Sequence, residues 1–260
     1  MHDITVRQRA ISLCRDGRSN ADISRQLGVP YGTVSWWRHE DLAKHGTLPG
    51  RKQSPCFRCH GSPLDQPAYT YLLGLYLGDG HIMHPKQHRV PNLAVTCDNN
   101  WPGVMDEVEQ AMRRVLPNNS PCRVRRIGCH DVKVYSMHLP CLFPQHGSGV
   151  KHKRLIALEP WQQDLVLTRP WQLIRGLIHS DGCRITNWTV RTVDGQPKRY
   201  EYPRYFFSNT STDIIRIFTH TLDSVSVEWK SATRSHGRTD ISIARKACVA
   251  LMDKHVGPKH

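Results

Sequence analysis

The stretch YLLGLYLGDG at residues 71–80 decides how this chain folds. Its first seven residues are almost entirely apolar, which predicts a buried helix, and the Asp79-Gly80 pair that follows is an ordinary turn signal. Taken alone, the stretch is a core helix and its exit. The chain repeats the pattern, however, as LIRGLIHSDG at residues 173–182. A second buried helix that ends on the same Asp-Gly pair needs a reason beyond packing.

The two stretches begin two copies of one subdomain. Placed over each other with an offset of 102 positions, they share four residues. The matching pairs are Gly74 and Gly176, Leu75 and Leu177, Asp79 and Asp181, and Gly80 and Gly182. The likeness continues, because each motif is followed by a hairpin-like region, an amphipathic helix, a second alternating region and a short helix.

The later elements match at a larger offset. The amphipathic helices near residues 104–115 and 214–225 correspond at an offset of 110, which indicates a second hairpin longer by eight residues. The copies close on GVKH at 149–152 and GPKH at 257–260. A copy of about 90 residues is too long for a solenoid unit. The order α-β-β-α-β-β-α therefore predicts an α+β fold of two pseudo-symmetric fused subdomains.

The first 46 residues predict a separate all-α domain of three helices. Ser19 is the expected N-cap of the second helix, Gly28 supplies the turn after it, and Pro30 starts the third. Val34 and Trp37 are expected to bury the third helix against the other two.

This spacing resembles the helix-turn-helix units of resolvases and transcription regulators. The remaining positions of the third helix are expected to face outward, toward a DNA major groove. They are Tyr31, Thr33, Ser35, Trp36 and Arg38. The alternative is a three-helix packing unit that does not contact DNA.

Residues 47–66 read as a basic linker, rich in Pro, Gly and Ser, with one thiol pair inside it. Cys56 and Cys59 have the spacing of half a tetrahedral Zn²⁺ site, and His60 or His39 are candidates for a further ligand. No second C-x-x-C completes the site. Plain thiols and a zinc knuckle both remain open at this point.

Composition points to a polyanionic partner. The 260 residues carry a formal net charge of +14, which favours nucleic acid first and an anionic membrane surface second. No apolar run is long enough to span a bilayer, and the N-terminus has no basic-then-apolar signal segment. We therefore expect a cytoplasmic protein, nucleoid-associated if bacterial. Nine scattered cysteines indicate reduced thiols and at most one metal site, not a disulfide framework.

The two Asp-Gly motifs resemble the LAGLIDADG signature of homing endonucleases, in the two-repeat, single-chain form. The likeness covers roughly residues 67–260, preceded by the helix-turn-helix domain. It implies a first repeat at 67–152, a connector at 153–169 and a second repeat at 170–260. It also implies double-stranded DNA as the partner. The protein is expected to act as a monomer, because both halves of the pseudo-twofold fold are on one chain.

The resemblance implies roles for particular residues. Gly74, Gly78, Gly176 and Ser180 are small residues that let the two motif helices pack side by side at the repeat interface. Asp79 and Asp181 would then lie together near the pseudo-twofold axis, where two carboxylates repel unless a cation separates them. Mg²⁺ is the expected cation, and each acid would serve the cleavage of one DNA strand. Arg245 resembles the basic residue often found near the metals in this family.

The sheets of both repeats are expected to form a saddle lined with cations. Alternation along a strand places every second side chain on the face toward DNA. The candidates in the first repeat are Arg89, Arg125 and Lys133, and those in the second are Arg184, Arg191, Lys230 and Arg238.

The chain also departs from the family pattern. A motif position that is often acidic holds Leu77 and His179, and the helix-turn-helix is not part of a minimal homing enzyme. Two functions therefore remain, with RNA binding as a third and weaker reading. The first is a metal-dependent DNA endonuclease, which the retained acid pair favours. The second is a non-cleaving DNA-binding regulator on the same fold, which the helix-turn-helix favours.

Overall fold

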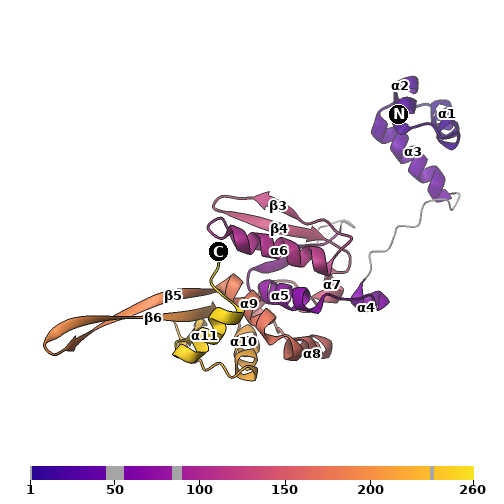
Figure 1. The fold of residues 1–260 in the computed structure, drawn as a ribbon. Helices are drawn as coiled ribbons and strands as arrows, with labels where there is room; N and C mark the ends of the chain where they lie inside the picture. The colour runs from indigo at the N-terminus through magenta and orange to yellow at the C-terminus, as the bar shows by residue number, and fades with distance from the viewer. Residues whose placement is uncertain (1, 45–55, 84–89, 235–236) are drawn as a thin grey trace. The chain divides into compact units, whose positions relative to one another are not determined.

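A computed structural model describes residues 2–44, 56–83, 90–234 and 237–260. The chain divides into two compact units, unit 1 at Met1–Gln53 and unit 2 at Ser54–His260 (Figure 1). The division falls inside the expected linker, of which residues 47–55 lie outside the described residues, as does the candidate Arg89. None of the helices described is both long and apolar enough to cross a membrane.

Unit 1 consists of three helices, α1 (Ile4–Arg15), α2 (Asn20–Leu27) and α3 (Tyr31–Lys44). The Ser19 side chain accepts from the backbone N–H of Asp22 and caps α2 as predicted. Gly28 adopts a φ of +63°, the left-handed conformation that lets the chain turn tightly before α3. The core is formed by Ala10, Cys14, Ile23, Val29, Val34 and Trp37.

Unit 2 contains two copies of the predicted order of elements, preceded by the short helix α4 (Phe57–His60). The first copy is α5 (Gln66–Leu77), β1 (Gly80–Met83), β2 (Asn92–Asp98), α6 (Pro102–Val115), β3 (Cys122–Arg125), β4 (Cys129–Tyr135) and α7 (Leu139–Leu142). A 3₁₀ turn at Lys151–Lys153 and α8 (Pro160–Thr168) follow it. The second copy is α9 (Pro170–Asp181), β5 (Gly182–Val193), β6 (Gln196–Asn209), α10 (Thr212–Ser224), β7 (Lys230–Thr233), β8 (Thr239–Ile243) and α11 (Lys246–His255).

Each repeat forms one four-stranded antiparallel sheet, with strand orders β1-β2-β4-β3 and β5-β6-β8-β7. The identical order confirms the predicted α+β fold of two pseudo-symmetric repeats. α6 packs on β2 and β4, and α10 packs on β6 and β8, so helices cover one face of each sheet and leave the opposite, open face uncovered by them. The apolar residues of both repeats join in one continuous core.

The two repeats differ most in their first hairpin. β1 has 4 residues, whereas β5 has 12 and β6 has 14. Asp194 and Gly195 connect β5 to β6 with φ angles of 51° and 77°, the positive pair of a type I′ turn that suits the twist of a hairpin. This hairpin projects well beyond the helices of unit 2 (Figure 1).

The repeats meet where α5 and α9 lie side by side. A Cβ added to Gly74 would lie 2.6 Å from the Leu173 carbonyl oxygen and 2.9 Å from the Gly176 Cα. A Cβ on Gly176 would in turn collide with the Tyr71 carbonyl oxygen. These obstacles are backbone atoms, which cannot rotate away as a side chain can. Glycine at both positions is therefore what allows the two helices to come this close.

We expect Gly176→Ala to destabilise unit 2 by about 3 kcal/mol or more, because the added methyl group forces the two helix backbones apart. Urea denaturation of the full chain measures this change on the transition of unit 2. Gly147→Ala is the matched control, since its nearest neighbour outside the adjoining chain is an Arg154 side-chain atom at 3.6 Å. Equal stability of the two variants would contradict the close packing of α5 on α9.

Candidate active site and nucleic-acid interface

Two acidic residues lie at the same end of the helix pair. Asp79 follows α5 directly after Gly78, and Asp181 is the last residue of α9. A Cβ added to Gly78 would lie 3.2 Å from Asp181 Oδ2, so the residue next to one acid already lies against the other. The close approach of the helices thus brings both carboxylates to the boundary between the repeats.

Each acid opens into a pocket of its own. A pocket of about 370 Å³ contains Asp79 together with Thr96, Cys97 and Asp98 at the end of β2. A second pocket of about 370 Å³ contains Asp181 with Ser208, Asn209 and Thr210 at the end of β6. β2 and β6 occupy the same place in their sheets, so the two pockets are equivalent positions of the two repeats.

The surroundings make both carboxylates costly to ionise. Burial, followed by the charge of Asp181, raises the pKa of Asp79 to about 6. The Asp79 side chain still reaches solvent through its pocket, although protein surrounds it on the other sides. Burial also raises the pKa of Asp181, but the Asn209 amide opposes this shift by donating a hydrogen bond of 2.7 Å to Asp181 Oδ2.

Two lysines that the sequence analysis missed offset the charge of the acid pair. Lys151 Nζ donates to the carbonyls of Tyr76, Leu77 at 3.2 Å and Gly78 at 2.6 Å, which are the last carbonyls of α5. Lys259 Nζ donates to the Ser180 carbonyl of α9 at 2.8 Å. Ammonium groups suit a helix C-terminus, where the exposed carbonyls carry partial negative charge.

The lysines act mainly on the acid of the opposite repeat. Burial lowers the pKa of Lys151 to about 8, and among the charges that oppose this shift Asp181 acts more strongly than Asp79. Burial also lowers the pKa of Lys259, which lies in the Asp79 pocket and is opposed most by Asp79. The matching GVKH and GPKH segments were the signal for this pair, since each places its lysine after the last helix of a repeat.

Comparison with known proteins agrees with this arrangement of elements. No family model and no curated protein sequence matches the chain. Among solved structures, a variant of the homing endonuclease I-DmoI superposes with a TM-score of 0.51 at 15% identity, over 73% of this chain and 90% of that protein. I-DmoI in complex with DNA and Mn gives 0.50 at 13% identity, over 75% and 98%. I-WcaI bound to its DNA recognition sequence gives 0.50 at 14% identity, over 82% and 91%.

The chain has the LAGLIDADG homing-endonuclease fold. At such low identity the likeness concerns the fold, and the site must be judged from its own residues. In LAGLIDADG terms, α5 and α9 are the two motif helices. The open faces of the two sheets are the two halves of the saddle.

The open face of each sheet holds its cations around one acid. Thr96 donates to Asp131 at 2.9 Å in the first repeat, and Ser208 donates to Asp240 at 2.6 Å in the second. Two basic side chains form ion pairs with each of these acids. They are Arg126 and Lys133 with Asp131, and Arg234 and Arg238 with Asp240. The candidates Lys133 and Arg238 therefore lie on the open face.

Strand alternation places two other candidates, Arg184 and Arg125, on the helix-covered face of their sheets and not on the open face. Arg184 pairs in register with the buried Tyr205 and forms an ion pair of 2.6 Å with Asp253 of α11, so it lies on the helix-covered face. Arg184 and Arg191 are seven positions apart, so a regular strand sends them to opposite faces. The expectation that both line the saddle was wrong for Arg184.

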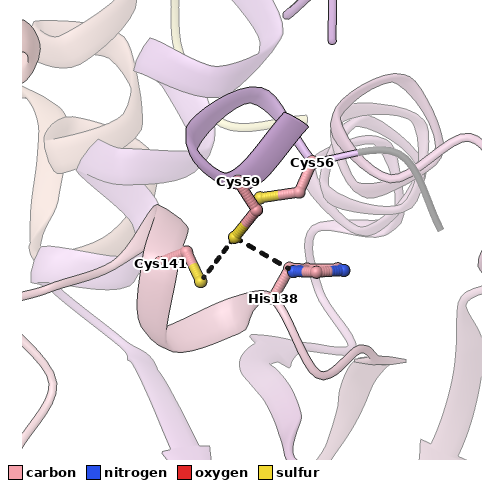
Figure 2. A group of neighbouring side chains, drawn as sticks. All are labelled: Cys56, Cys59, His138 and Cys141. Atoms are coloured by element: carbon pink, nitrogen blue, oxygen red, sulfur yellow. Dashed lines mark hydrogen bonds between the residues drawn. The ribbon is translucent and has the colours of Figure 1, made fainter. Parts of the chain in front are cut away.

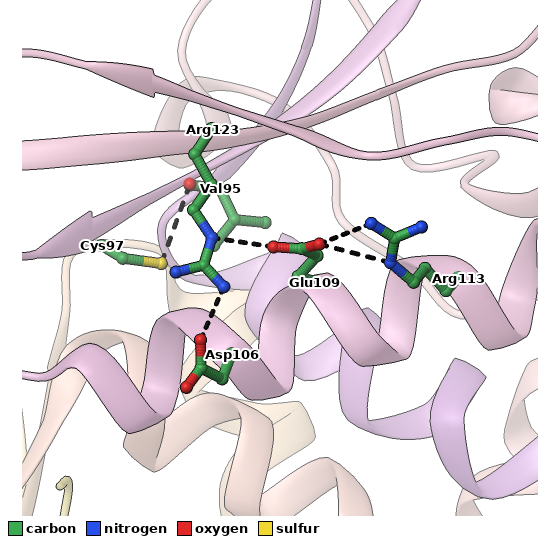
Figure 3. Close-up of polar contacts among 6 residues, drawn as sticks. All are labelled: Val95, Cys97, Asp106, Glu109, Arg113 and Arg123. Carbon is green, nitrogen blue, oxygen red and sulfur yellow. Dashed lines mark hydrogen bonds and ion pairs between the residues drawn. The ribbon is translucent and has the colours of Figure 1, made fainter.

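The prediction that Arg125 lines the open face was also wrong, because of its strand parity. Arg125 has the strand parity of Arg123, whose guanidinium is held by Asp106 at 2.6 Å and Glu109 at 2.7 Å on α6 (Figure 3). Arg125 is therefore directed toward the helix-covered side of β3. The neighbouring Arg126 is the residue that reaches the open face.

The long hairpin and β7 supply further exposed cations. Arg191 is exposed and has the open-face parity, and Lys230 is exposed opposite Ser242 of β8. Aromatic rings lie among the basic residues of the hairpin: Arg199 stacks over Trp188 at 5.1 Å and Lys198 over Tyr200 at 5.7 Å. Such mixed basic and aromatic surfaces suit contacts with phosphates and bases.

Arg245 has a different partner from the one expected. It precedes α11 and forms an ion pair with Glu228, and its side chain is 64% exposed. The cations that act on the acids are Lys151, Lys259 and, for Asp181, Arg238. The structure thus brings Lys151 and Lys259 near the acids and pairs Arg245 with Glu228 instead.

In unit 1, four of the five candidates on α3 are at least partly exposed to solvent, whereas the guanidinium of Arg38 is directed inward. Tyr31 and Trp36 are 58% and 63% exposed, and Thr33 and Ser35 are half-buried. Arg38 was expected to face outward, but its guanidinium turns inward to Asn20 at 2.8 Å and to the carbonyls of Cys14 and Arg18, each at 3.2 Å. Its three hydrogen bonds instead satisfy polar groups among the three helices.

His179 is a buried neutral residue of the repeat interface. Its Nδ1 lies 2.9 Å from the Tyr71 hydroxyl of the opposite motif helix. Glu107 Oε2 is 3.6 Å away, but Glu107 is already ion-paired with Arg175. Burial, together with the nearby charges of Arg175, Lys259 and His260, lowers the pKa of His179 to about 3.

This shift makes stability depend on pH. A histidine with a pKa of about 3 when folded and 6.5 when free binds fewer protons in the folded state between those values. The stability it contributes is complete above pH 6.5 and is lost as the pH falls, by about 2 kcal/mol between pH 7 and pH 5. Urea denaturation across this range should show this loss as the difference between wild type and His179→Gln, because the raised pKa of Asp79 contributes with the opposite sign in both proteins. The exposed His220 supplies the control His220→Gln, which should retain the wild-type dependence.

Proposed function

We propose that the protein is a metal-dependent DNA endonuclease that hydrolyses one phosphodiester bond in each strand of a duplex. The observation that carries the proposal is the paired, equivalent arrangement of Asp79 and Asp181, each in a pocket of its own repeat with a lysine from the other repeat nearby. The neighbouring folds support it, since I-DmoI is known in complexes with DNA and Mn, Ca or Mg.

The residues at the acid pair fit a hard divalent cation. Both carboxylates have a raised pKa, so a positive ion that favours their charged forms would be bound with a gain in free energy. Carboxylate oxygens are donors that Mg²⁺ prefers, and Asp79 and Asp181 supply them, while Asn209 directs its NH2 to Asp181 and orients that carboxylate. When bound, Mg²⁺ supplies Lewis-acid stabilisation of the phosphate oxygens.

The remaining residues of the site would position the phosphate and balance its charge. In the hydrolysis, water oxygen bonds to phosphorus, the bond to the leaving oxygen breaks, and that oxygen takes up a proton. Negative charge grows on the phosphoryl oxygens in this step, and the ammonium groups of Lys151 and Lys259 are held where they can oppose it. Because Lys259 of the second repeat lies in the Asp79 pocket and the charge of Lys151 of the first repeat acts on Asp181, we propose that a monomer is active and that neither repeat is active alone.

The saddle would hold the duplex through its open faces. Arg126, Arg234 and Arg238 are already oriented there by Asp131 and Asp240, so they lose little conformational freedom on binding a phosphate, whereas Lys133 is buried beside Asp131. Arg191 and the stacked Lys198 and Tyr200 of the β5–β6 hairpin have the open-face parity and extend this surface on the side of the second repeat only. A DNA site read by such a surface need not be palindromic.

The test is cleavage of a duplex selected from a random library by its binding to the wild-type protein. We expect wild type to cut both strands in Mg²⁺. Asp79→Asn and Asp181→Asn should each lower the cleavage rate about a hundredfold or more, since each removes a charge that holds the cation. Binding of the duplex should be retained, because phosphate contacts from the sheets supply most of the affinity.

Asp106→Asn is the matched control. It also removes one carboxylate, but from the exposed helix face of α6, and it should cut at the wild-type rate. The alternative function is a non-cleaving DNA-binding regulator. A wild-type protein that binds its duplex tightly and never nicks it in Mg²⁺ or Mn²⁺ would replace the endonuclease proposal with this alternative.

We further propose that unit 1 is a DNA-binding helix-turn-helix. The capped α2, the left-handed turn at Gly28 and the exposed aromatic residues of α3 support this role. α3 would then enter a major groove and add contacts beyond those of the saddle.

Substitutions on α3 test this role. Trp36→Ala should weaken binding of the selected duplex about tenfold without lowering thermal stability, because the ring is exposed. Arg38→Ala should instead lower the stability of unit 1, because three hydrogen bonds between its helices are lost. If Trp36→Ala protects the same bases as wild type with unchanged affinity, unit 1 does not read DNA.

A further inference from the structure

Four side chains in unit 2 converge on one point away from the acid pockets. Cys56, Cys59, His138 and Cys141 each direct one sulfur or nitrogen atom inward, and all four atoms lie within 4.8 Å of one another (Figure 2). Cys59 Sγ is 3.6 Å from His138 Nδ1 and 3.4 Å from Cys141 Sγ. None of these residues lines the pocket of Asp79 or that of Asp181.

The four residues come in two pairs with equal spacing. Cys56 directly precedes α4 and Cys59 lies in it. In the same way, His138 directly precedes α7 and Cys141 lies in it. In each pair the two residues are separated by two others, CFRC in one and HLPC in the other. The spacing that suggested half a zinc site therefore occurs twice, but the second pair begins with histidine. Its distance along the chain, 79 residues from Cys59 to His138, hid the relation.

We propose that Cys56, Cys59, His138 and Cys141 bind one Zn²⁺ in a closed tetrahedral site. Three thiolates and one imidazole form a donor set that structural zinc sites use. Zinc–sulfur distances of about 2.3 Å and zinc–nitrogen distances of about 2.0–2.1 Å place two sulfurs about 3.8 Å apart, and a sulfur and a nitrogen about 3.5 Å apart, in a tetrahedron. The Cys59–Cys141 sulfur–sulfur separation of 3.4 Å and the Cys59–His138 sulfur–nitrogen separation of 3.6 Å are close to these values.

The neighbours of the cluster exclude other arrangements. Sulfur atoms 3.4 Å apart are too far for a disulfide, whose bond is about 2.05 Å long, and Cys59 and Cys141 are free. His60, which the sequence suggested as a ligand, is not in the group, and its ring packs edge-on against His138 at 5.4 Å. His39, the other suggested ligand, is in α3 and is also not in the group.

Packing holds the first pair in place without the metal. Cys56 is only 2% exposed, and Phe57 lies against Trp161 of α8 with ring centroids 5.6 Å apart. Arg58 stacks over the same Trp161 ring at 5.3 Å. The ligands are thus brought together by the fold, which is the condition for a preorganised site.

Four protein ligands leave no open position, so the metal has a structural role. It joins α4, the first helix described after the linker, to α7, the last helix of the first repeat. The closed loop contains the motif helix α5 and the whole first sheet, and cross-links that close long loops restrict the unfolded chain most. The site would fix the point at which the linker from unit 1 joins unit 2.

Metal analysis of the full chain, purified without chelator, tests the site. We expect about one Zn²⁺ per chain, reduced to about one tenth or less in Cys59→Ser and in Cys141→Ser. Cys122→Ser, which alters an exposed thiol on β3, is the matched control and should keep the full equivalent. His138→Cys should also keep it, because a thiolate can replace the imidazole as a ligand.

Two further measurements do not depend on variants. Replacement of the metal by Co²⁺ should give the visible absorption of a tetrahedral thiolate site. Removal of the metal by a chelator should lower the Tm of unit 2 by about 5 °C or more, and added Zn²⁺ should restore it.

Three results would overturn the proposal: wild type with less than about a tenth of an equivalent of zinc, iron with labile sulfide in its place, or a Cys59–Cys141 disulfide. The zinc site is independent of the endonuclease proposal. Asp79→Asn and Asp181→Asn should keep their zinc whether or not the wild type cleaves DNA.

Discussion

The close approach of α5 to α9 depends on the absence of two methyl groups. Gly74 and Gly176 meet with no room for a Cβ on either, and the obstacles on both sides are backbone atoms. The continuity of the core across the repeats and the meeting of the two acids both depend on this close approach. A wider helix crossing would separate Asp79 from Asp181 and each lysine from the acid of the opposite repeat.

The same closeness creates an electrostatic cost that the structure only partly offsets. Two carboxylates share one boundary, and burial removes much of the water that would solvate them. Two ammonium groups approach from opposite repeats, but they are themselves buried and occupied by helix carbonyls. The two carboxylates would therefore be stabilised by binding a further cation. A DNA phosphate could then replace the helix carbonyls as a partner of the lysine ammonium groups.

Much of the fold could be predicted because the sequence contains two copies of the same subdomain. A repeated Asp-Gly motif and equal element order gave both sheets, the longer second hairpin and the place of the acids. Positions that depend on strand parity were less secure, as Arg184 and Arg125 illustrate, because a run of basic residues does not reveal which face each one takes. Arg38 was misplaced because a long side chain on an outward position can still turn back to polar groups between helices.

The residues that sequence reasoning missed are those brought together from distant segments. Lys151 and Lys259 follow the last helix of each repeat, and nothing local directs them to the C-termini of α5 and α9. His138 and Cys141 lie in a short helix far from Cys56 and Cys59. In both cases the spacing within each segment was visible, as GVKH and GPKH or as CFRC and HLPC. Only the folded chain establishes which segments meet.

The anchoring of α8 has a consequence for association between molecules. A surface that pairs two related subdomains within a chain can also pair them between chains, which is the route to domain-swapped dimers. Gln162 of α8 donates to the Tyr69 hydroxyl at 2.7 Å, and Tyr69 donates to the Leu142 carbonyl at 2.6 Å. This contact holds the connector against α5 just before α9 begins, so it raises the local concentration of α9 at its partner. The connector thereby biases the second repeat toward the first repeat of its own chain and against that of a neighbour.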